Sequence, residues 1–265
     1  MDTRFDGKTV VVTGGGKGIG KRAALRFAEL GASIAICSRT RSEIDTAAQE
    51  IEDAGGRAMA FAMDVAEQEQ VREFVDRTVD TFGSVDILVN NAAVVGAPGR
   101  YNVDLVDMPF EDWDLVYGIN LRGPALMAKY AMPHMIRKCK GAIINLSSEV
   151  IRREMRGRAH YTATKMGVIG LTYSLAWEGA EHGIRTNCII PGSVATELLD
   201  GFHQRLAEEE GIPFDELRAR FAAASPEKRV ISTDEGADLM IYLASDAASG
   251  VNGQSLFINA ASAMQ

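Results

Sequence analysis

Short, uniformly apolar segments alternate with longer amphipathic segments along almost the whole chain. In Thr9–Thr13 (TVVVT) and Val85–Asn90 (VDILVN), apolar side chains occupy consecutive positions, so both faces of an extended segment would be largely apolar. Strands of this kind must be covered on both sides, as they are in a parallel sheet between two layers of helices. The alternation therefore predicts an α/β fold with a doubly wound parallel sheet built from right-handed βαβ units.

The ends of these segments are marked by glycines, prolines and charged residues. No linker, internal repeat or low-complexity segment divides the chain, so we expect residues 1–265 to form a single domain. The predicted strands are Thr9–Thr13, Ser33–Cys37, Ala58–Met63, Val85–Asn90, Ala142–Leu146, Arg185–Ile190 and Ser255–Ile258. The predicted helices are Ile19–Leu30 (ending at Gly31), Ser42–Ala54, Glu67–Phe82, Glu111–Arg137 and Tyr161–Glu181.

Residues 193–232 interrupt this alternation, because no strand signal occurs in them. The tripeptide Gly211-Ile212-Pro213 divides the region into two short helices, whose apolar residues, among them Leu198 and Phe202, recur at helical spacing. We interpret the region as a helical lid that closes over a bound ligand and excludes water. A permanently packed subdomain is the alternative.

Net charge and cysteine usage restrict the partners and the compartment. The chain has 28 Lys and Arg against 36 Asp and Glu, a formal charge of −8, which disfavours nucleic acid and anionic membranes as partners. The polar N-terminus does not fit a signal peptide, and no apolar run approaches the roughly 18 residues of a spanning helix. Cys37, Cys139 and Cys188 are far apart in apolar surroundings, so we expect buried free thiols, no metal site and a cytoplasmic protein.

A cluster of glycines joins the first predicted strand to the first predicted helix. Its glycine spacing is wider than in the usual dinucleotide-binding fingerprint. Glycines permit the sharp turn and let backbone N–H groups approach a pyrophosphate at the helix N-terminus. The position after a buried strand favours a Rossmann-type dinucleotide site over a tight packing turn. The turn residues assigned to the cofactor are Thr13, Gly14, Gly16, Lys17, Gly18, Ile19 and Gly20.

The end of the second predicted strand bears on the choice of cofactor. Binding of the ribose hydroxyls of NAD calls for an acidic residue about 20 positions beyond the glycines. Ser38 and Arg39 stand there instead, so we expect no carboxylate to repel a 2′-phosphate. Arg39 and Lys17 supply two cations, which favours NADP(H). The alternative is that both side chains are merely solvated.

A tyrosine and a lysine lie one helical turn apart. Tyr161 and Lys165 are at positions i and i+4, and a neighbouring ammonium stabilises a phenolate and lowers its pKa. Such a pair can move a proton at a carbonyl or carbinol oxygen. Ser147 and Ser148 follow a predicted strand, where ligands meet parallel sheets. Asn120 lies inside a predicted helix, where it can distort the backbone or hold a water.

At this point the sequence resembles the short-chain dehydrogenase/reductase family over essentially its whole length. The glycine turn looks like the family's TGxxxGxG, and Asn90-Asn91-Ala92 looks like its NNAG, with Ala93 in place of the glycine. Asn120 resembles the family's helical Asn, and Ser148 lies 13 residues before Tyr161. Residues 191–196 (PGSVAT) resemble its PGxxxT. All of these motifs occur in order and at family spacing.

The resemblance implies roles for individual residues. Tyr161 would be the acid/base, Lys165 would lower its pKa and bind the nicotinamide ribose, Ser148 would hold the substrate oxygen, and Asn120 would fix a water that relays protons. The other residues that the resemblance places at the cofactor are Asp64, Val65, Asn91, Ala92, Pro191, Gly192, Val194 and Thr196. It also implies a homotetramer, with the helices from Glu111 and Tyr161 forming contacts.

The segment between Ser148 and Tyr161 carries four arginines and two glutamates. In the family it lines the substrate site, so we interpret it as attracting an anionic substrate. A solvated or subunit-facing basic loop is the alternative. The candidate substrate residues are Ser148, Glu149, Val150, Arg152, Arg153, Leu198 and Phe202.

These observations predict an NADP(H)-dependent oxidoreductase that transfers a hydride between the nicotinamide and a ketone or secondary alcohol. The nearest alternative is an NAD(H)-dependent dehydrogenase that oxidises a secondary alcohol, polyol or ring diol. A dinucleotide-binding redox sensor without catalysis is disfavoured, because Tyr161 and Lys165 are both present.

Overall fold

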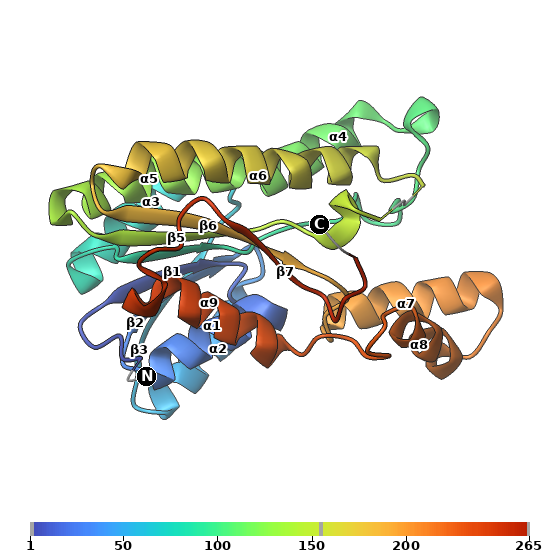
Figure 1. Ribbon diagram of the computed structural model, residues 1–265, viewed down its shortest axis with the longest axis horizontal. Coiled ribbons are helices and arrows are strands. Elements are labelled where there is room, and N and C mark those ends of the chain that lie inside the picture. The colour runs from blue at the N-terminus through green and yellow to red at the C-terminus, as the bar shows by residue number, and fades with distance from the viewer. Residues whose placement is uncertain (1–2, 154–155, 264–265) are drawn as a thin grey trace.

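A parallel sheet forms the centre of the protein (Figure 1). The computed structural model describes residues 3–153 and 156–263, and in them the sheet has seven strands. The strands are β1 (Thr9–Thr13), β2 (Ser33–Ser38), β3 (Arg57–Ala62), β4 (Ile87–Asn90), β5 (Gly141–Leu146), β6 (Ile184–Pro191) and β7 (Ser255–Ile258). Their order is β3-β2-β1-β4-β5-β6-β7, and every neighbouring pair is parallel. This order confirms the predicted doubly wound, Rossmann-type sheet.

Helices cover both faces of the sheet (Figure 1). Val10 and Val12 of β1 pack toward one helical layer and Val11 toward the other, and all three are fully buried. The uniformly apolar strand sequences thus have the predicted cause. One layer consists of α1 (Gly18–Glu29), α2 (Arg41–Asp53) and α9 (Thr233–Ala244). The other consists of α3 (Gln68–Phe82), α5 (Gly123–Lys138) and α6 (Ala159–Ala180).

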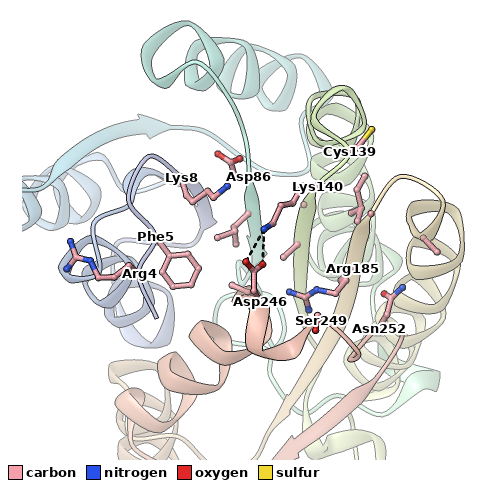
Figure 2. Close-up of a pocket in the computed structure, with 17 residues that line it drawn as sticks. Arg4, Phe5, Lys8, Asp86, Cys139, Lys140, Arg185, Asp246, Ser249 and Asn252 are labelled. Carbon is pink, nitrogen blue, oxygen red and sulfur yellow. Dashed lines mark hydrogen bonds and ion pairs between the residues drawn. The ribbon is translucent and has the colours of Figure 1, made fainter. Parts of the chain in front are cut away.

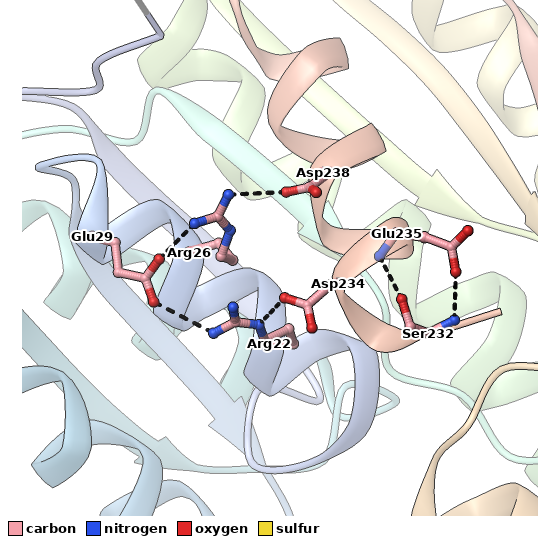
Figure 3. Close-up of polar contacts among 7 residues, drawn as sticks. All are labelled: Arg22, Arg26, Glu29, Ser232, Asp234, Glu235 and Asp238. Atoms are coloured by element: carbon pink, nitrogen blue, oxygen red, sulfur yellow. Dashed lines mark hydrogen bonds and ion pairs between the residues drawn. The ribbon is translucent and has the colours of Figure 1, made fainter.

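Charged side chains join α1 to α9 at the surface (Figure 3). Arg22 Nε lies 2.5 Å from Asp234 Oδ1, and Arg26 Nη2 lies 3.2 Å from Asp238 Oδ1. Arg26 also pairs with Glu29 of its own helix at 2.7 Å. Ion pairs between exposed side chains contribute little to the stability of a protein. We therefore infer that these pairs mainly align the two helices.

The start of α9 is fixed by a capping box (Figure 3). The Ser232 hydroxyl accepts a hydrogen bond from the Glu235 backbone N–H at 3.1 Å, and the Glu235 carboxylate accepts one from the Ser232 N–H at 2.8 Å. This reciprocal pair satisfies two backbone donors that a helix start leaves free.

The predicted helix Glu111–Arg137 is confirmed, but it is not a regular α-helix throughout. It consists of α4 (Phe110–Tyr117), a π-helical turn at Gly118–Arg122 and α5. Asn120 lies in the π-helical turn, and its side chain hydrogen-bonds to the backbone of Val94. The π-helical turn coincides with this polar residue, as the expected distortion by Asn120 implies.

Two further helices extend beyond the carboxyl ends of the strands (Figure 1). They are α7 (Glu197–Glu210) and α8 (Phe214–Ala223), and Gly211 between them has a φ of +67°, which suits glycine. The division of residues 193–232 into two short helices is therefore confirmed. Short 3-10 turns occupy Leu105–Asp107, Glu149–Ile151 and Asp246–Ala248.

The three cysteines differ in burial, which corrects one expectation. Cys37 and Cys188 are buried free thiols, but Cys139 is exposed. Cys139 follows the last residue of α5, where a left-handed backbone conformation turns the chain out of the helix at the surface. Among the described residues, no helix has the length and apolar character needed to cross a membrane.

Candidate active site

The carboxyl ends of β1 and β4 lie side by side at the point where the strand order reverses. The glycine turn follows β1, and Gly14 there has a φ of +66°. A Cβ at Gly20 would lie 2.3 Å from Asn91 Nδ2, too close for any side chain. The glycines are therefore required by the backbone turn and by its contact with the residues after β4.

The start of α1 fits the phosphates of a dinucleotide. Lys17, the residue that precedes α1, makes no side-chain cap, and the first turn carries no acidic residue. A helix N-terminus of this kind presents N–H groups and positive partial charge to an anion. A Cβ at Gly18 would lie 3.3 Å from Thr196 Cγ2, so the start of α7 lies against the same turn. Val194 is buried just before it.

Thr13 ties the glycine turn to the residues after β4. Its hydroxyl accepts hydrogen bonds from the N–H groups of Asn91 and Ala92, both at 3.0 Å. The Asn91 amide donates in return to the carbonyls of Thr13 and Gly14, at 3.0 and 3.1 Å. These four predicted cofactor residues are therefore brought together, and their hydrogen bonds join the ends of the two strands.

The two cations predicted for a 2′-phosphate each face a carboxylate. Lys17 Nζ lies 3.1 Å from Glu43, and Arg39 Nη1 lies 4.0 Å from Asp64. The expectation that no carboxylate is close is therefore wrong, because α2 and the segment after β3 each bring one to this edge. Both cationic side chains remain 57% exposed, so a phosphate could compete for them.

The other residues predicted around the cofactor lie at strand ends. The Ser38 hydroxyl donates to the Thr40 carbonyl, and the Asp64 carboxylate accepts from the Ala66 N–H. Val65 is buried, and a Cβ at Gly123 would approach its side chain to 2.9 Å. At the end of β6, Pro191 pairs with β7, and the Gly192 N–H donates to the Ile258 carbonyl.

Tyr161 lies in the first turn of α6 and is almost completely buried. Burial raises the pKa of its phenol, while a hydrogen bond with Ser148 and the nearby Arg158 guanidinium act in the opposite direction. Ser148 follows β5, so the two hydroxyls meet at the carboxyl edge of the sheet. A phenol that stays protonated at neutral pH can donate a proton to a substrate oxygen.

Lys165 is 3% exposed, and its ammonium donates to the Leu146 carbonyl at 2.9 Å. It lies 5.7 Å from the centroid of the Tyr161 ring. Burial lowers the pKa of Lys165 to about 8. The sequence suggested this ammonium as the cause of a lower tyrosine pKa. In the structure Ser148 and Arg158 also lower it, and the contribution of Lys165 stays a prediction.

Asn120 is also buried, and it lies in the π-helical turn between α4 and α5. Its Oδ1 accepts from the Val94 N–H at 2.8 Å, and its Nδ2 donates to the Val94 carbonyl at 2.8 Å and to Thr164 Oγ1 at 3.4 Å. Thr164 is the residue next to Lys165, so the π-helical turn connects α6 to the loop after β4. A water relay through Asn120 stays a prediction.

The candidate substrate residues of the 149–160 segment are partly engaged in the protein. The buried Glu149 carboxylate pairs with Arg153 at 2.7 Å and accepts from Ser262. Val150 is buried against Tyr161, and Arg152 is exposed. The second glutamate of the segment, Glu154, lies outside the described residues.

The lid region contacts this segment through aromatic side chains. Phe202 of α7 lies 5.9 Å from Phe221 of α8, measured between ring centroids. The Arg158 guanidinium lies 5.1 Å from the Phe202 ring centroid. Leu198 is 52% exposed at the start of α7. Of the two lid residues predicted for the substrate, Phe202 is thus the one that contacts Arg158, three residues before Tyr161.

Sequence reasoning did not single out Arg158 or its partner Asn102. Arg158 Nε donates to Asn102 Oδ1 at 2.9 Å, which links the start of α6 to the loop before α4. The available signal was spacing, because Arg158 lies three residues before Tyr161 and shares its helical side.

A separate cavity of about 460 Å³ lies at the amino ends of the strands (Figure 2). Charged side chains surround it, and Lys140 pairs with Asp246 at 2.9 Å. None of the residues predicted for the site lines this cavity. Among residues 3–153 and 156–263, no cluster of three metal-ligating side chains occurs.

A family model and three known proteins to which this chain is similar are all described as reductases. A family model described as enoyl-(acyl carrier protein) reductase matches residues 14–260. The 3-oxoacyl-[acyl-carrier-protein] reductase FabG of Thermotoga maritima is 34% identical over 97% of this chain and 98% of the relative. The protein of the same name from Staphylococcus aureus is 35% identical over 95% and 96%. The crystal structure of levodione reductase is similar with a TM-score of 0.90 at 28% identity, over 97% of this chain and 98% of that one.

The fold and the site define a class of α/β protein in which a glycine turn and a tyrosine–lysine pair meet at the carboxyl edge of a parallel sheet. The family model and the relatives above 30% identity span almost the full chain. The chain belongs to the short-chain dehydrogenase/reductase family, as the sequence motifs predicted.

Proposed function

We propose that the protein is an NADP(H)-dependent oxidoreductase that interconverts a ketone and a secondary alcohol. The observation that carries this proposal is the buried Tyr161 side chain, which lies beside Ser148 at the carboxyl edge of the sheet. Lys165 lies one helical turn away on the same helix. The names of the two FabG relatives and of levodione reductase, all reductases, support the same type of reaction.

The side chains would act on the substrate oxygen. Ser148 would hold the carbonyl oxygen, and Tyr161, kept protonated by its burial, would donate a proton to it. In the oxidative direction the phenolate would accept the alcohol proton. Lys165 would hold the nicotinamide ribose and, as an ammonium, favour the phenolate. The bound nicotinamide supplies the hydride.

The choice of NADP(H) rests on Lys17 and Arg39. Both side chains are half exposed at the edge where an adenosine ribose would lie, and neither position carries an acidic residue that would bind its hydroxyls. We expect Arg39→Asp to weaken NADPH binding at least about tenfold and to leave NADH binding within a few-fold. Titration of each cofactor by nicotinamide fluorescence measures this. Unchanged NADPH affinity would contradict the assignment and favour the NAD(H) alternative, in which a secondary alcohol, polyol or ring diol is oxidised.

Assembly into a homotetramer forms part of the proposal. The outer face of α6 carries three large exposed side chains, Met166, Tyr173 and Trp177, of which Trp177 is 87% exposed. An apolar stripe of this kind on a long helix favours association with a second copy. Light scattering on the purified protein measures the mass. Buried thiols at Cys37 and Cys188 suit a reducing compartment, and we place the protein in the cytoplasm.

The deciding experiment is turnover measured at the nicotinamide absorbance band. Both reduced cofactors are tested against a panel of neutral and acidic ketones, and both oxidised cofactors against secondary alcohols and diols. We expect ketone reduction with NADPH. Cofactor binding without turnover of any compound would contradict the proposal and favour a redox-sensing role.

A further inference from the structure

Arg158 is a buried cation beside the proposed acid/base. It is 7% exposed, it precedes the first residue of α6, and Tyr161 follows three residues later. The guanidinium and the phenol influence one another electrostatically, since each shifts the pKa of the other. The arginine therefore lies within one helical turn of the proposed acid/base along the chain.

The immediate partners of Arg158 are all uncharged. Its Nε donates to the Asn102 amide oxygen at 2.9 Å, and its guanidinium carbon lies 5.1 Å from the Phe202 ring centroid. In the part of the chain that the structure describes, Arg158 forms no ion pair, and the side-chain hydrogen bond of its guanidinium comes from Nε. Its two Nη groups are not among the buried polar atoms without a partner, so they reach solvent and can meet a ligand. Burial of a guanidinium without a counter-charge is unfavourable, and its two Nη groups form a planar pair of donors that matches a carboxylate.

The other arginines of this segment do not share these properties. Arg153 pairs with the buried Glu149, and Arg156, 88% exposed, pairs with Asp104. Arg152 is exposed to solvent. Arg158 is thus the cation of the described segment that combines burial, a free donor edge and proximity to Tyr161.

We propose that Arg158 binds the carboxylate of a short oxo-acid substrate while the ketone oxygen of the same molecule lies at Tyr161 and Ser148. Arg158 and Tyr161 lie within one turn at the start of α6, and the carboxylate and ketone carbons of a 2-oxo or 3-oxo acid are separated by only one or two carbon–carbon bonds, so a short oxo acid suits two groups this close in the chain. Phe202 would cover the bound anion from the lid and exclude water. The inference rests on the proposed function and assigns its substrate class.

The test compares one acid with its neutral ester. For the wild type, Arg158→Met and Arg156→Met, kcat/KM is measured with 3-oxobutanoate and with methyl 3-oxobutanoate. We expect the acid-to-ester ratio to fall at least about tenfold in Arg158→Met, which removes hydrogen bonds to a charged group. The ratio should be unchanged in Arg156→Met, which removes the same charge from the exposed part of the loop. Thermal unfolding checks that both variants are folded.

Binding gives a second measurement that does not depend on turnover. Calorimetric titration of 3-oxobutanoate into each protein saturated with oxidised cofactor should show the same loss of affinity in Arg158→Met alone. Equal losses on acid and ester would make Arg158 a positioning residue for Tyr161 and overturn the proposal, as would an unchanged ratio. A protein that turns over no ketone but binds the acid through Arg158 would instead contradict the proposed function while supporting this assignment.

Discussion

Buried charges that differ in pairing lie at the two edges of the central sheet. At the carboxyl edge Lys165 and Arg158 are buried cations, and in the described residues neither forms an ion pair. At the amino edge the buried Asp86 carboxylate accepts hydrogen bonds from Lys138, Ser84 and the Thr9 N–H. An unpaired buried charge costs more stability than a paired one, because no counter-charge or hydrogen bond offsets its desolvation. We infer that the carboxyl edge is arranged for binding and proton transfer and the amino edge for stability.

The comparison is tested most strongly at Tyr161. We expect Tyr161→Phe to lower kcat by about 10²–10⁴-fold, because the proton donor at the substrate oxygen is lost. The free energy of unfolding should change little, since the ring and its packing remain. Steady-state turnover and urea unfolding measure the two effects. Retained turnover would show that another group moves the proton.

Lys165 allows the cost of a buried charge to be measured by pH. In the unfolded chain its pKa is near 10.5, and in the folded protein it is about 8. The folded state therefore carries the cost of the ammonium below pH 8, and the cost disappears as pH rises toward 10.5. The cofactor-free wild type should gain up to about 3 kcal/mol relative to Lys165→Met between these pH values.

Urea unfolding of both proteins from pH 7 to pH 10, at one protein concentration, provides this measurement. Burial raises the pKa of Cys188 to about 11, so this thiol lowers stability as pH rises above its unfolded value. Because the Lys165 ammonium lowers the pKa of Cys188, this contribution differs between the two proteins, so both carry Cys188→Ala in the comparison. A difference that does not depend on pH would mean that the ammonium is solvated in the folded state.

At the amino edge of the sheet, the contribution of a buried, hydrogen-bonded carboxylate can be measured at Asp86. Burial raises the pKa of this carboxyl, but the hydrogen bonds from Lys138, Thr9 and Ser84 outweigh it, so the pKa lies below its usual value. Asp86→Asn should cost about 1–3 kcal/mol at pH 7, and the deficit should shrink as pH falls through the lowered pKa. Turnover should be retained. Asp246→Asn in the same cavity (Figure 2) is the control, and we expect a smaller loss because its side chain is 82% exposed. Equal losses of unfolding free energy in the two variants would contradict the distinction between a buried and an exposed carboxylate.

Much of the fold and part of the site could be predicted from the sequence, for different reasons. Consecutive apolar residues such as Val10–Val12 specify a strand buried on both faces, so the sheet followed directly. Tyr161 and Lys165 share one helix, so their proximity is a matter of spacing. The π-helical turn at Asn120 could be suspected but not placed, because its cause is a hydrogen bond to Val94 in a distant loop.

Contacts between separate elements could not be predicted. The carboxylates that face Lys17 and Arg39 come from α2 and from the segment after β3, so their approach depends on how the elements pack. The four arginines between Ser148 and Tyr161 are equivalent in a composition count, but Arg158 is buried and Arg156 is exposed. Side-chain direction in an irregular loop is set by tertiary contacts, which a single sequence does not specify.

An exposed ion pair tests whether burial or pairing determines how much a charge contributes to stability. Arg26 and Asp238 pair across α1 and α9, as Asp86 and Lys138 pair at the amino edge, but the Asp238 side chain is 58% exposed (Figure 3). Asp238→Asn should therefore cost at most about 0.5 kcal/mol, and less at high salt. Ser232→Ala, which removes the cap of the same helix, should cost about 1 kcal/mol and serves as a reference for the sensitivity of α9. Urea unfolding at low and high salt measures both. A loss in Asp238→Asn as large as that in Asp86→Asn would mean that pairing alone, and not burial, determines how much these charges contribute.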